Sequence, residues 1–533
     1  MSSDGRRPDH AALVGTIQSV WATELGSPAA PDDDFFAAGG TSLAAARIIG
    51  ALREQGIDTG FTMLMRHRTP ARFAAAILAG DGAARLSLPH LEDDATPPVT
   101  VQQETIWFLE QLRPDNIAYQ NLAVIDLPER VDSVRLADAL ATLAARHSLL
   151  RTSFPVRRGR PVLLEQPDPV VHLDTADLSA MDPAERDLWI RDLGRRPFDL
   201  TEAGAVRWTL AELGDGRQAL ILVEHHFLHD GWSLGRLMTE LAHVYRTGSS
   251  AGLPALPHRY ADYAAWQRMW LQTDAAAGSR KFWVELLADP VEPLRLGDDA
   301  RRPADFSFTG DTYHDRLPDA VVASADSYAR SQRTTSFVVL MAAFAAVVGG
   351  VSGSPDFNLG SMLRNRRVPG TENILGMFVT TIALPVRGLP ARTMRDVTAE
   401  LSEVLTSGLD HQEIPFPSVA RELRAGRDGS RNPHFQVCFS MNDYPDLRPA
   451  WGPGQRAGLR FPSNGGAKFD LDVVLLPEAR GYRALWRYCT PLLTAEQVRS
   501  LATVFHDAVR ALTSAPDSPI AAVLGDVLPG ALR

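Results

Sequence analysis

Cysteine is scarce in this chain, which has Cys438 and Cys489 as its only thiols among 533 residues. So few cysteines exclude a disulfide framework and a cysteine-based zinc site, and their apolar, strand-like surroundings predict two buried free thiols. The longest apolar run, residues 337–351, is shorter than the roughly 20 residues that a membrane-spanning helix needs. The N-terminal residues also lack the apolar segment of a signal peptide. We therefore expect a cytoplasmic protein with no membrane partner.

Lysine is nearly absent as well, because Lys281 and Lys468 are the only lysines among 54 basic side chains. Acidic side chains number 64, which gives a formal net charge of −10 at pH 7. Since binding to a phosphate backbone requires a basic surface, this charge argues against nucleic acid as the main partner.

The chain is too long for one hydrophobic core, so several folding units are expected. Apolar residues recur at helical spacing in three stretches, 13–25, 45–52 and 70–78, which predicts a small helical unit. Residues 81–98 have the Gly, Pro and Asp content of a linker. From residue 99 onward strand-like and helical stretches mix, which predicts two α/β lobes. The strand-like stretches are 217–227, 435–441 and 471–476, and the helical ones are 233–245 and 335–348.

The first chemical motif surrounds Ser42, in the stretch D-D-D-F-F-A-A-G-G-T-S-L at 32–43. A serine at the start of a helix is often only an N-cap that accepts a backbone N–H. Here two glycines keep bulk away from the hydroxyl, and a helix N-terminus also suits a phosphate. The acidic cluster, the phenylalanine pair and the glycines together resemble the attachment motif of carrier proteins. This resemblance implies that Ser42 carries a phosphopantetheine ester as a covalent cofactor.

The second motif is H-H-F-L-H-D-G at 225–231, between a strand-like and a helical stretch. A histidine that is neutral near pH 7 can accept a proton from an attacking amine, or orient it. No third ligand at zinc-like spacing accompanies the pair, so no metal is expected. Asp230 is expected to be structural, because a buried carboxylate needs a cationic partner. Gly231 is expected to permit a tight turn and a close approach of substrate.

Six further stretches accompany this motif in a fixed order along the chain. They are T-V-Q-Q-E-T-I-W-F-L (100–109), R-H-S-L-L-R-T-S-F (146–154), Y-A-D-Y-A-A-W-Q (260–267), I-L-G-M-F-V-T-T (374–381), H-Q-E-I-P-F (411–416) and R-D-G-S-R-N-P (427–433). In this order they resemble the motifs of condensation domains of nonribosomal peptide synthetases, relatives of chloramphenicol acetyltransferase. The resemblance covers residues 99–533, whereas Trp107, Trp266 and Phe416 within the motifs are expected to be core aromatics.

The resemblance implies a helical-bundle carrier followed by a two-lobed α/β chloramphenicol-acetyltransferase-like condensation domain, a V-shaped pseudo-dimer. The expected division is a peptidyl carrier domain at 1–83, a linker at 84–98 and a condensation domain at 99–533. Within the last, an N-lobe of about 99–275 and a C-lobe of about 276–533 are expected.

The same resemblance assigns roles to the motif residues. His226, with His225 and Gly231, is implied to be catalytic, and His226 is expected to face a tunnel between the lobes. Because neighbouring side chains of a strand point to opposite faces, we expect His225 to turn into the fold. Arg364, in M-L-R-N-R, is implied to pair with Asp230 across the lobes.

The implied reaction forms an amide bond between an aminoacyl or peptidyl thioester on the carrier arm and an acceptor amine. The implied partners are a phosphopantetheinyl transferase, an adenylation domain acting in trans, other synthetase modules and, for a carrier-bound acceptor, an acceptor carrier domain. Three departures from the family's motifs leave this reaction class intact and bear on the substrate subtype. Thr105, Thr380 and Pro417 stand where the family usually has Arg, Asn and an acidic residue.

Several related functions remain as alternatives. An epimerisation domain shares both histidines but reads D-x-x-S-W after them, whereas this chain reads D-G-W-S. A heterocyclisation domain has aspartates in place of the histidines, and a β-lactam-forming subtype has a third histidine where this chain has Glu224. A non-catalytic recruitment module loses the second histidine or the glycine, both of which are present. An acyltransferase that uses free coenzyme A is disfavoured by the attached carrier.

Overall fold

The computed structural model describes most of the chain, with gaps in the carrier region and at several loops. The described residues are 9–40, 44–45, 48–49, 51–52, 55, 57, 59, 61–79, 87–92, 95–168, 171–423, 428–442, 450–452, 454–478, 481–525 and 527. Ser42 lies outside the described residues, so its placement stays a prediction.

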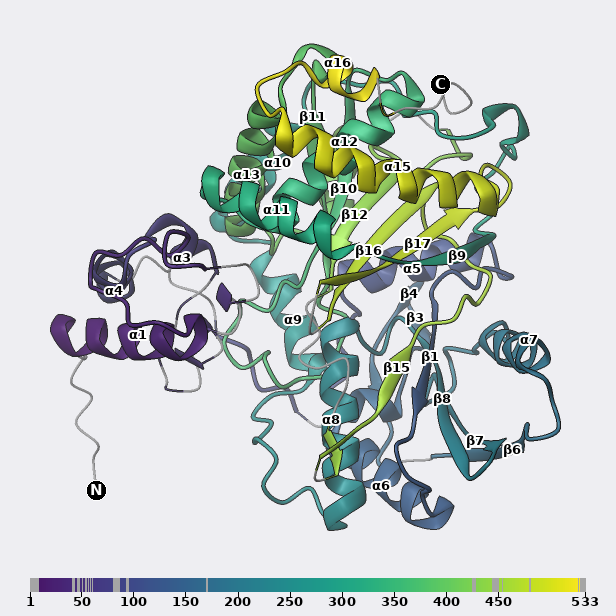
Figure 1. The fold of residues 1–533 in the computed structure, drawn as a ribbon. Coiled ribbons are helices and arrows are strands. Elements are labelled where there is room, and N and C mark those ends of the chain that lie inside the picture. The colour runs from purple at the N-terminus through teal and green to yellow at the C-terminus, as the bar shows by residue number, and fades with distance from the viewer. Residues whose placement is uncertain are drawn as a thin grey trace.

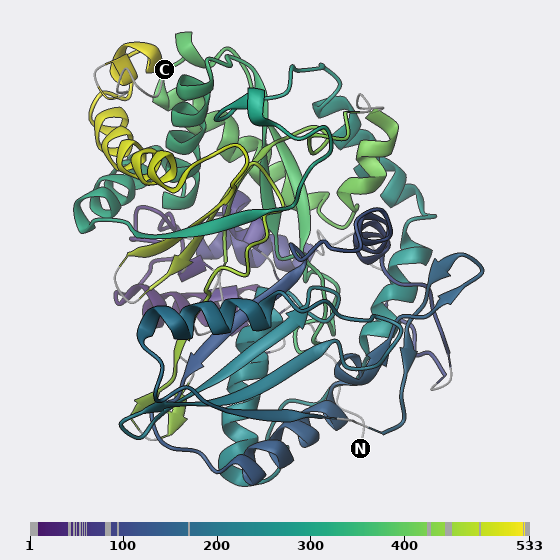
Figure 2. The same ribbon diagram turned by 90° about the vertical axis from the view of Figure 1, so that its right-hand side faces the viewer.

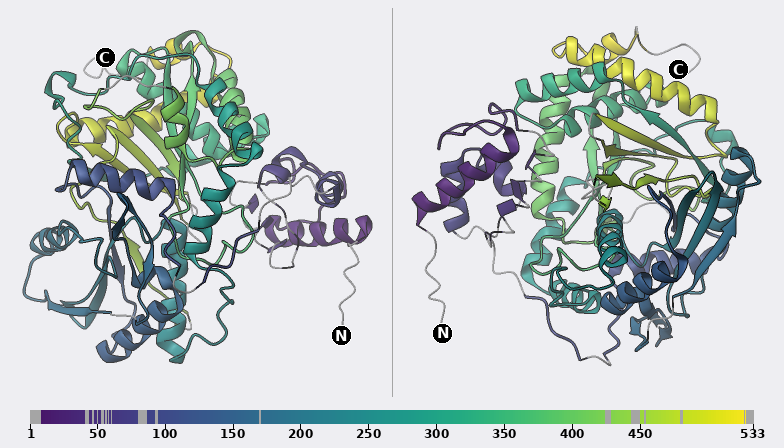
Figure 3. Two further views of the ribbon diagram at one scale, coloured as in Figure 1. Left: turned by 180° about the vertical axis from the view of Figure 1, so that it is seen from behind. Right: turned by 60° about the horizontal axis from the view of Figure 1, so that its bottom comes forward.

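The N-terminal unit is helical, as expected from its apolar periodicity. Its helices are α1 (His10–Leu25), α3 (Phe61–Arg66) and α4 (Pro70–Ala79), and helical backbone is also present at 44–45, 48–49 and 51–52. Trp21 of α1 packs edge-on against Phe35, with ring centroids 5.3 Å apart. This small core is separate from the main one, and the unit lies to one side of the rest of the molecule (Figures 1 and 3).

The helical unit contacts the larger part of the chain through α3. This helix packs on α13 (Met394–Asp410), and Arg66 forms an ion pair with Asp410 there. The following linker is held as well, since the backbone N–H of Leu91 donates to Asp262 and Arg259 donates to the Leu91 carbonyl.

The first lobe is a five-stranded sheet in the order β15-β1-β8-β7-β6. Its strands are β1 (Gln120–Asp126), β6 (Leu173–Asp177), β7 (Val206–Gly214), β8 (Arg217–His225) and β15 (Gly458–Arg460). Its helices are α5 (Val101–Leu112), α6 (Ser133–Arg146), α7 (Pro183–Gly194), α8 (Gly231–Thr247) and α9 (Tyr260–Trp270). Helices α6 and α8 pack on each other, while α7 covers the opposite face of the sheet (Figure 2). Short elements between them are η1 (Ser148–Arg151), β2 (Thr152–Ser153), β3 (Val156–Arg157), β4 (Arg160–Pro161) and β5 (Leu164–Glu165).

The second lobe is a six-stranded mixed sheet in the order β11-β10-β12-β16-β17-β9. Its strands are β9 (Gly310–Arg316), β10 (Phe357–Leu363), β11 (Thr380–Val386), β12 (Val437–Met441), β16 (Leu471–Pro477) and β17 (Tyr482–Cys489). Its other elements are α10 (Asp274–Leu286), η2 (Asp299–Arg301), α11 (Asp319–Gln332), α12 (Ser336–Ser352), η3 (Leu389–Ala391), α13, α14 (Phe416–Leu423), α15 (Ala495–Ser514) and α16 (Ile520–Gly525).

The apolar helix expected near 335–348 is α12, which lies between α11, α13 and α15 with nearly all its side chains buried. Among the described residues no single helix is long and apolar enough to cross a membrane; only the bent pair α11–α12 passes that test, by length and composition. Both cysteines are buried free thiols, as predicted.

One segment crosses from the second half of the chain back to the first lobe. Strand β15 pairs with β1, with Val124 opposite Arg460, and Asp126 forms a two-bond ion pair with Arg460. The hairpin of β13 (Ala450–Gly452) and β14 (Gln455–Arg456) packs on α8. The division into lobes at residues 275 and 276 is therefore wrong for this segment.

Candidate active site

The H-H-F-L-H-D-G motif forms a tight loop between β8 and α8. Strand β8 ends at His225, and α8 begins at Gly231. The backbone N–H of His225 donates to the Ala205 carbonyl, and that of His226 donates to the Tyr119 carbonyl. The start of the loop is thus fixed on both sides by neighbouring strands and their ends.

His225 turns into the fold. Its side chain is almost fully buried, its Nδ1 accepts the Phe227 backbone N–H, and its Nε2 lies 2.6 Å from Oε1 of Glu110. Because Nδ1 accepts, Nε2 carries the proton and donates to Glu110. His225 therefore points into the fold and holds the loop, as the alternation of side chains along a strand predicts.

His226 is the partly exposed member of the pair. Its Nδ1 lies 3.2 Å from the His229 carbonyl oxygen, which can only accept, so Nδ1 carries the proton. The Nε2 lone pair then has no hydrogen-bond partner among the described residues. Burial, followed by the Lys468 ammonium, holds the pKa of His226 well below its ordinary value. The imidazole is thus neutral at pH 7 and able to accept a proton.

Asp230 joins the two lobes. Its Oδ1 accepts from the backbone N–H and the hydroxyl of Ser233, capping α8, and its Oδ2 accepts the Phe378 backbone N–H. Its ion-pair partner is Arg366, at 3.1 Å, and both side chains are buried. The prediction that Arg364 pairs with Asp230 is wrong, since the Arg364 guanidinium lies over the Trp232 ring at 4.3 Å.

The backbone conformation between Arg364 and Arg366 explains why the second arginine, and not the first, pairs with Asp230. Asn365, between the two arginines, has φ +53°. This left-handed residue breaks the extended path that β10 would otherwise continue. Its side chain is held by the Phe378 carbonyl, so the turn is built into the lobe junction.

Gly231 opens α8 and is not among the described glycines with positive φ, so a left-handed turn is not the reason for a glycine there. The close approach of substrate that is expected at Gly231 stays a prediction, while another glycine of the site lies against a protein side chain. A Cβ on Gly376 would lie 2.1 Å from the Tyr260 ring. The Tyr260 hydroxyl donates to the Met377 carbonyl, which locks the 260–267 motif to the 374–381 motif.

The 100–109 motif also supports the loop. Thr100 and Gln103 form a capping box at the start of α5, and the Gln103 amide donates to the Phe227 carbonyl at 2.9 Å. The 146–154 motif acts elsewhere, because His147 and Arg146 both bind Glu240 of α8. The motifs thus divide into those that hold the H-H-F-L-H-D-G loop and those that hold the lobe together.

The loop before Ser42 is shaped around an aromatic ring. Gly39 has φ +90°, and a Cβ on Gly40 would meet the Phe35 ring at 2.4 Å. The Gly40 N–H donates to the Phe35 carbonyl, and Asp34 accepts the N–H groups of Phe36 and Ala37. The chain is therefore held close to the core up to Gly40, the last described residue before Ser42.

Four site residues were missed by the sequence reasoning: Glu110, Glu224, His229 and Lys468. The available signal was polarity in an apolar setting, since Glu224 follows the run I-L-V and His229 follows F-L. Buried or half-buried ionisable groups at a candidate catalytic motif are functional candidates in their own right.

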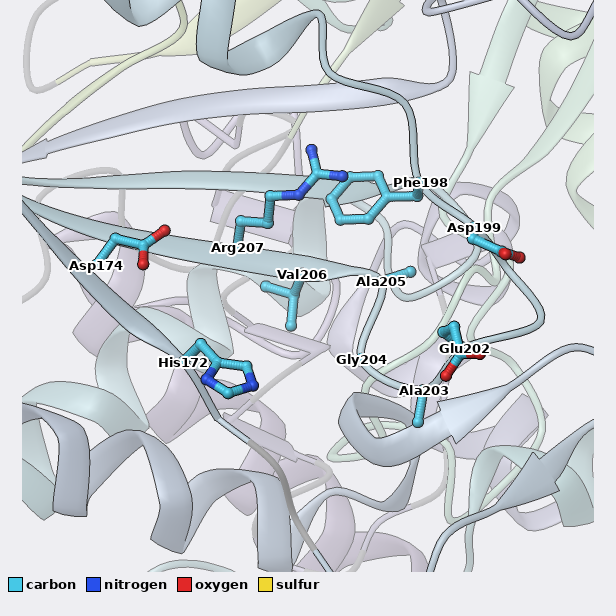
Figure 4. A pocket seen from close by; sticks show the side chains of 10 residues that line it. All are labelled: His172, Asp174, Phe198, Asp199, Glu202, Ala203, Gly204, Ala205, Val206 and Arg207. Carbon is cyan, nitrogen blue, oxygen red and sulfur yellow. The ribbon is translucent and has the colours of Figure 1, made fainter.

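A separate surface pocket lies at the start of β7 (Figure 4). It is lined by His172, Asp174, Phe198, Asp199, Glu202, Ala203, Gly204, Ala205, Val206 and Arg207. The Arg207 guanidinium covers the Phe198 ring at 3.8 Å. No residue of the H-H-F-L-H-D-G motif lines it, so this pocket does not define the reaction site.

Among the described residues one set of three possible metal ligands lies away from the loop, formed by His90, His258 and Asp262. The two imidazole rings stack with an interplanar angle of 23°, so their lone pairs do not converge on one point. Asp262 already accepts the backbone N–H groups of Leu91 and Arg259. This set is better explained as packing of the linker on α9.

Comparison with known protein families shows to which family the chain belongs. Residues 94–524 match the condensation domain family, and residues 15–77 match the phosphopantetheine attachment site family. The chain therefore belongs to the condensation domain family and carries an N-terminal phosphopantetheine attachment domain. The expected carrier–condensation order and fold class are confirmed.

Two curated relatives illustrate the match. The chain is 30% identical over 517 residues to tyrocidine synthase 2 of Brevibacillus parabrevis, a match that covers 96% of this chain and 14% of that protein. It is 31% identical over 463 residues to the phosphinothricin tripeptide synthetase PhsC of Streptomyces viridochromogenes, covering 85% of this chain and 42% of that protein. The chain thus spans a minor part of these relatives.

Solved structures show the same fold. The first condensation domain of the calcium-dependent antibiotic synthetase superposes with a TM-score of 0.71 at 21% identity, covering 82% of this chain and 100% of that one. The X-domain from teicoplanin biosynthesis gives 0.73 at 22% identity, covering 82% and 99%. The condensation part is therefore a two-lobed chloramphenicol-acetyltransferase-like fold.

Proposed function

We propose that this chain is a component of a nonribosomal peptide synthetase that forms an amide bond. The acyl donor is an aminoacyl or peptidyl thioester on the arm carried by Ser42, and the acceptor is an amine. The observation that carries this proposal is the free Nε2 of His226, on a loop tied to both lobes, in a chain with an attachment domain.

The phosphopantetheine arm and the residues of the loop have different roles in the proposed reaction. When bound, the phosphopantetheine arm supplies the thiol that carries the acyl group. The amine nitrogen attacks the thioester carbonyl, the C–N bond forms, the C–S bond breaks, and the thiol leaves with a proton. His226 Nε2 accepts or orients the proton of the amine, while the Asp230–Arg366 pair holds the loop between the lobes.

The proposed reaction requires several partners. A phosphopantetheinyl transferase must load Ser42, and an adenylation domain, which we propose acts in trans, must supply the activated amino acid. The acceptor amine comes from another synthetase module, either as an acceptor carrier domain or as a small molecule. A cytoplasmic location, where these partners and coenzyme A would meet, belongs to the same proposal.

A non-catalytic module that recruits a carrier domain is the first alternative function. One structural relative is described as a complex of the X-domain and OxyB, and it matches with a TM-score of 0.73 at 23% identity. His226 and Gly231 are both present here, and they favour a catalytic condensation domain over a degenerate recruiting one. An epimerisation-type activity is the second alternative, and the order D-G-W-S speaks against it.

We expect Ser42→Ala to abolish loading of the phosphopantetheine arm, because the hydroxyl oxygen forms the phosphoester. Incubation with a phosphopantetheinyl transferase and coenzyme A, followed by intact-protein mass spectrometry, should show one arm on the wild type and none on the variant. Thr41→Ala is the matched control, because it removes the neighbouring hydroxyl and should still accept one arm. An arm on Ser42→Ala would overturn the assignment.

A further inference from the structure

Glu224 and His229 form a buried acid–histidine pair at the H-H-F-L-H-D-G loop. Glu224 is the penultimate residue of β8, and His229 lies within the loop. The residues are 2% and 1% exposed, and Oε2 of Glu224 contacts Nε2 of His229. Neither of these two buried atoms has a hydrogen-bond partner among the described residues, so the contact between them is the one available to satisfy both.

The hydrogen-bond pattern of His229 limits where the protons are. Its Nδ1 lies 3.3 Å from the Asp230 carbonyl oxygen, which can only accept, so Nδ1 carries a proton. A neutral imidazole then accepts at Nε2, which requires the proton of the contact to sit on Glu224. The other arrangement, a cationic His229 against an ionised Glu224, places two charges in a site closed to water.

Burial favours the neutral arrangement on both sides of the contact. It raises the pKa of Glu224 well above its ordinary value, and the nearby Asp230 carboxylate adds to that effect. It lowers the pKa of His229 to about 4, although the charge of Asp230 opposes this and that of Arg366 assists it. Asn121 approaches the other Glu224 oxygen at 3.5 Å.

This pair is joined to the catalytic group through one carbonyl. The backbone oxygen of His229 is the group that accepts the Nδ1–H of His226, at 3.2 Å. A His229 side chain anchored at both nitrogens fixes the peptide that bears this carbonyl. The tautomer and ring orientation of His226 therefore depend on a side chain that does not itself face the partly exposed part of the site.

We propose that Glu224 and His229 form a neutral hydrogen-bonded pair that positions His226 through the His229 carbonyl and keeps its Nε2 free for the acceptor amine. This assignment rests on the proposed amide-forming function. Glu224 and His229 are positioning residues, and neither touches the reacting atoms.

The direct test compares two changes at Glu224. Glu224→Gln keeps a donor, because the Gln amide N–H can take the place of the carboxyl O–H toward His229 Nε2. We expect its single-turnover transfer rate to stay within about threefold of wild type. Glu224→Ala leaves the His229 nitrogen without a partner, and we expect a loss of roughly tenfold or more.

Glu240 provides a matched control in the same lobe. It also contacts a buried histidine, His147, at 2.7 Å, but two arginines, Arg146 and Arg236, bind it as well. Despite burial, the His147 and Arg146 contacts lower its pKa to about 2, so it is ionised. Glu240→Gln should therefore reduce the melting temperature at pH 7, whereas Glu224→Gln should not.

The dependence on pH separates the two pairs further. A raised pKa means that folded wild type keeps the Glu224 proton above about 4.5, where the unfolded chain releases it. The free energy of unfolding of wild type therefore falls as the pH rises from that value. In Glu224→Gln this part of the pH dependence of the free energy of unfolding should be absent. For Glu240, whose pKa is lowered, stability is lost as the pH falls from 4.5 toward 2.

Nitrogen-15 NMR of labelled histidines supplies a readout independent of activity. At pH 7, His229 should be a neutral Nδ1–H tautomer in wild type and in Glu224→Gln. A cationic His229, or a Glu224→Gln protein as slow as Glu224→Ala, would overturn the neutral pair. Absence of transfer by wild type would instead refute the proposed function, and the NMR and melting results would still decide the state of the pair.

Discussion

Replacing His226 by alanine should slow amide formation by about 10²–10⁴-fold, the usual contribution of a general acid–base group. The structure gives the reason, because Nδ1–H is committed to the His229 carbonyl and only Nε2 remains to receive the amine proton. The low pKa of this imidazole keeps Nε2 unprotonated at neutral pH. The measurement is single-turnover transfer from acyl-loaded carrier to an accepted amine.

Two controls make this result specific. His226→Ala should load Ser42 and melt like wild type, since its side chain is partly exposed and makes one backbone contact. His225→Ala should lose stability, because it removes the Glu110 and Phe227 hydrogen bonds from the buried end of β8. Full transfer by His226→Ala, after subtraction of uncatalysed aminolysis, would refute the catalytic role of this histidine.

Breaking the buried ion pair between the lobes should have the largest effect on stability. Asp230→Ala leaves Arg366 without its only carboxylate among the described residues, and Arg366→Ala leaves Asp230 uncompensated. Removal of one partner of such a pair costs about 3–5 kcal/mol. Denaturant unfolding of each variant, followed at the transition of the condensation part, measures this loss.

Arg364→Ala is the matched control for this pair. It removes an arginine two residues away that lies over Trp232, and we expect a cost of about 1 kcal/mol or less. The outcome that contradicts the structure is the reverse order, with Arg364→Ala more destabilising than Arg366→Ala. An Asp230→Ala protein with wild-type unfolding and a raised substrate requirement would assign Asp230 to binding.

Local patterns predicted the helices and strands, because helix and strand periodicity depends on near neighbours, whereas the motifs and their order came from the resemblance to condensation domains. The helix of α12 and strand β8 were found in this way. The partner of Asp230 was not, because the left-handed Asn365 turns the chain between Arg364 and Arg366. A single positive-φ residue in a loop carries too little sequence signal to show which of two arginines points inward.

Long-range pairing was the second feature that the sequence did not show. Strand β15 is three residues long and joins a sheet whose next strand lies more than 300 positions earlier. The Glu224–His229 contact was missed for a different reason. Each residue alone is an ordinary polar position, and only the return of the loop over β8 brings the two together.

The measurement that tests the central claim most directly is intact-protein mass spectrometry of acyl-loaded wild type before and after an acceptor amine is added. Our account predicts that the acyl mass leaves the Ser42 arm, that the arm remains as the free thiol, and that the amide product appears in equal amount. It also predicts that His226→Ala, loaded to the same extent, keeps its acyl group over the same time. Loss of the acyl group as free acid, or equal transfer by both proteins, would contradict the account.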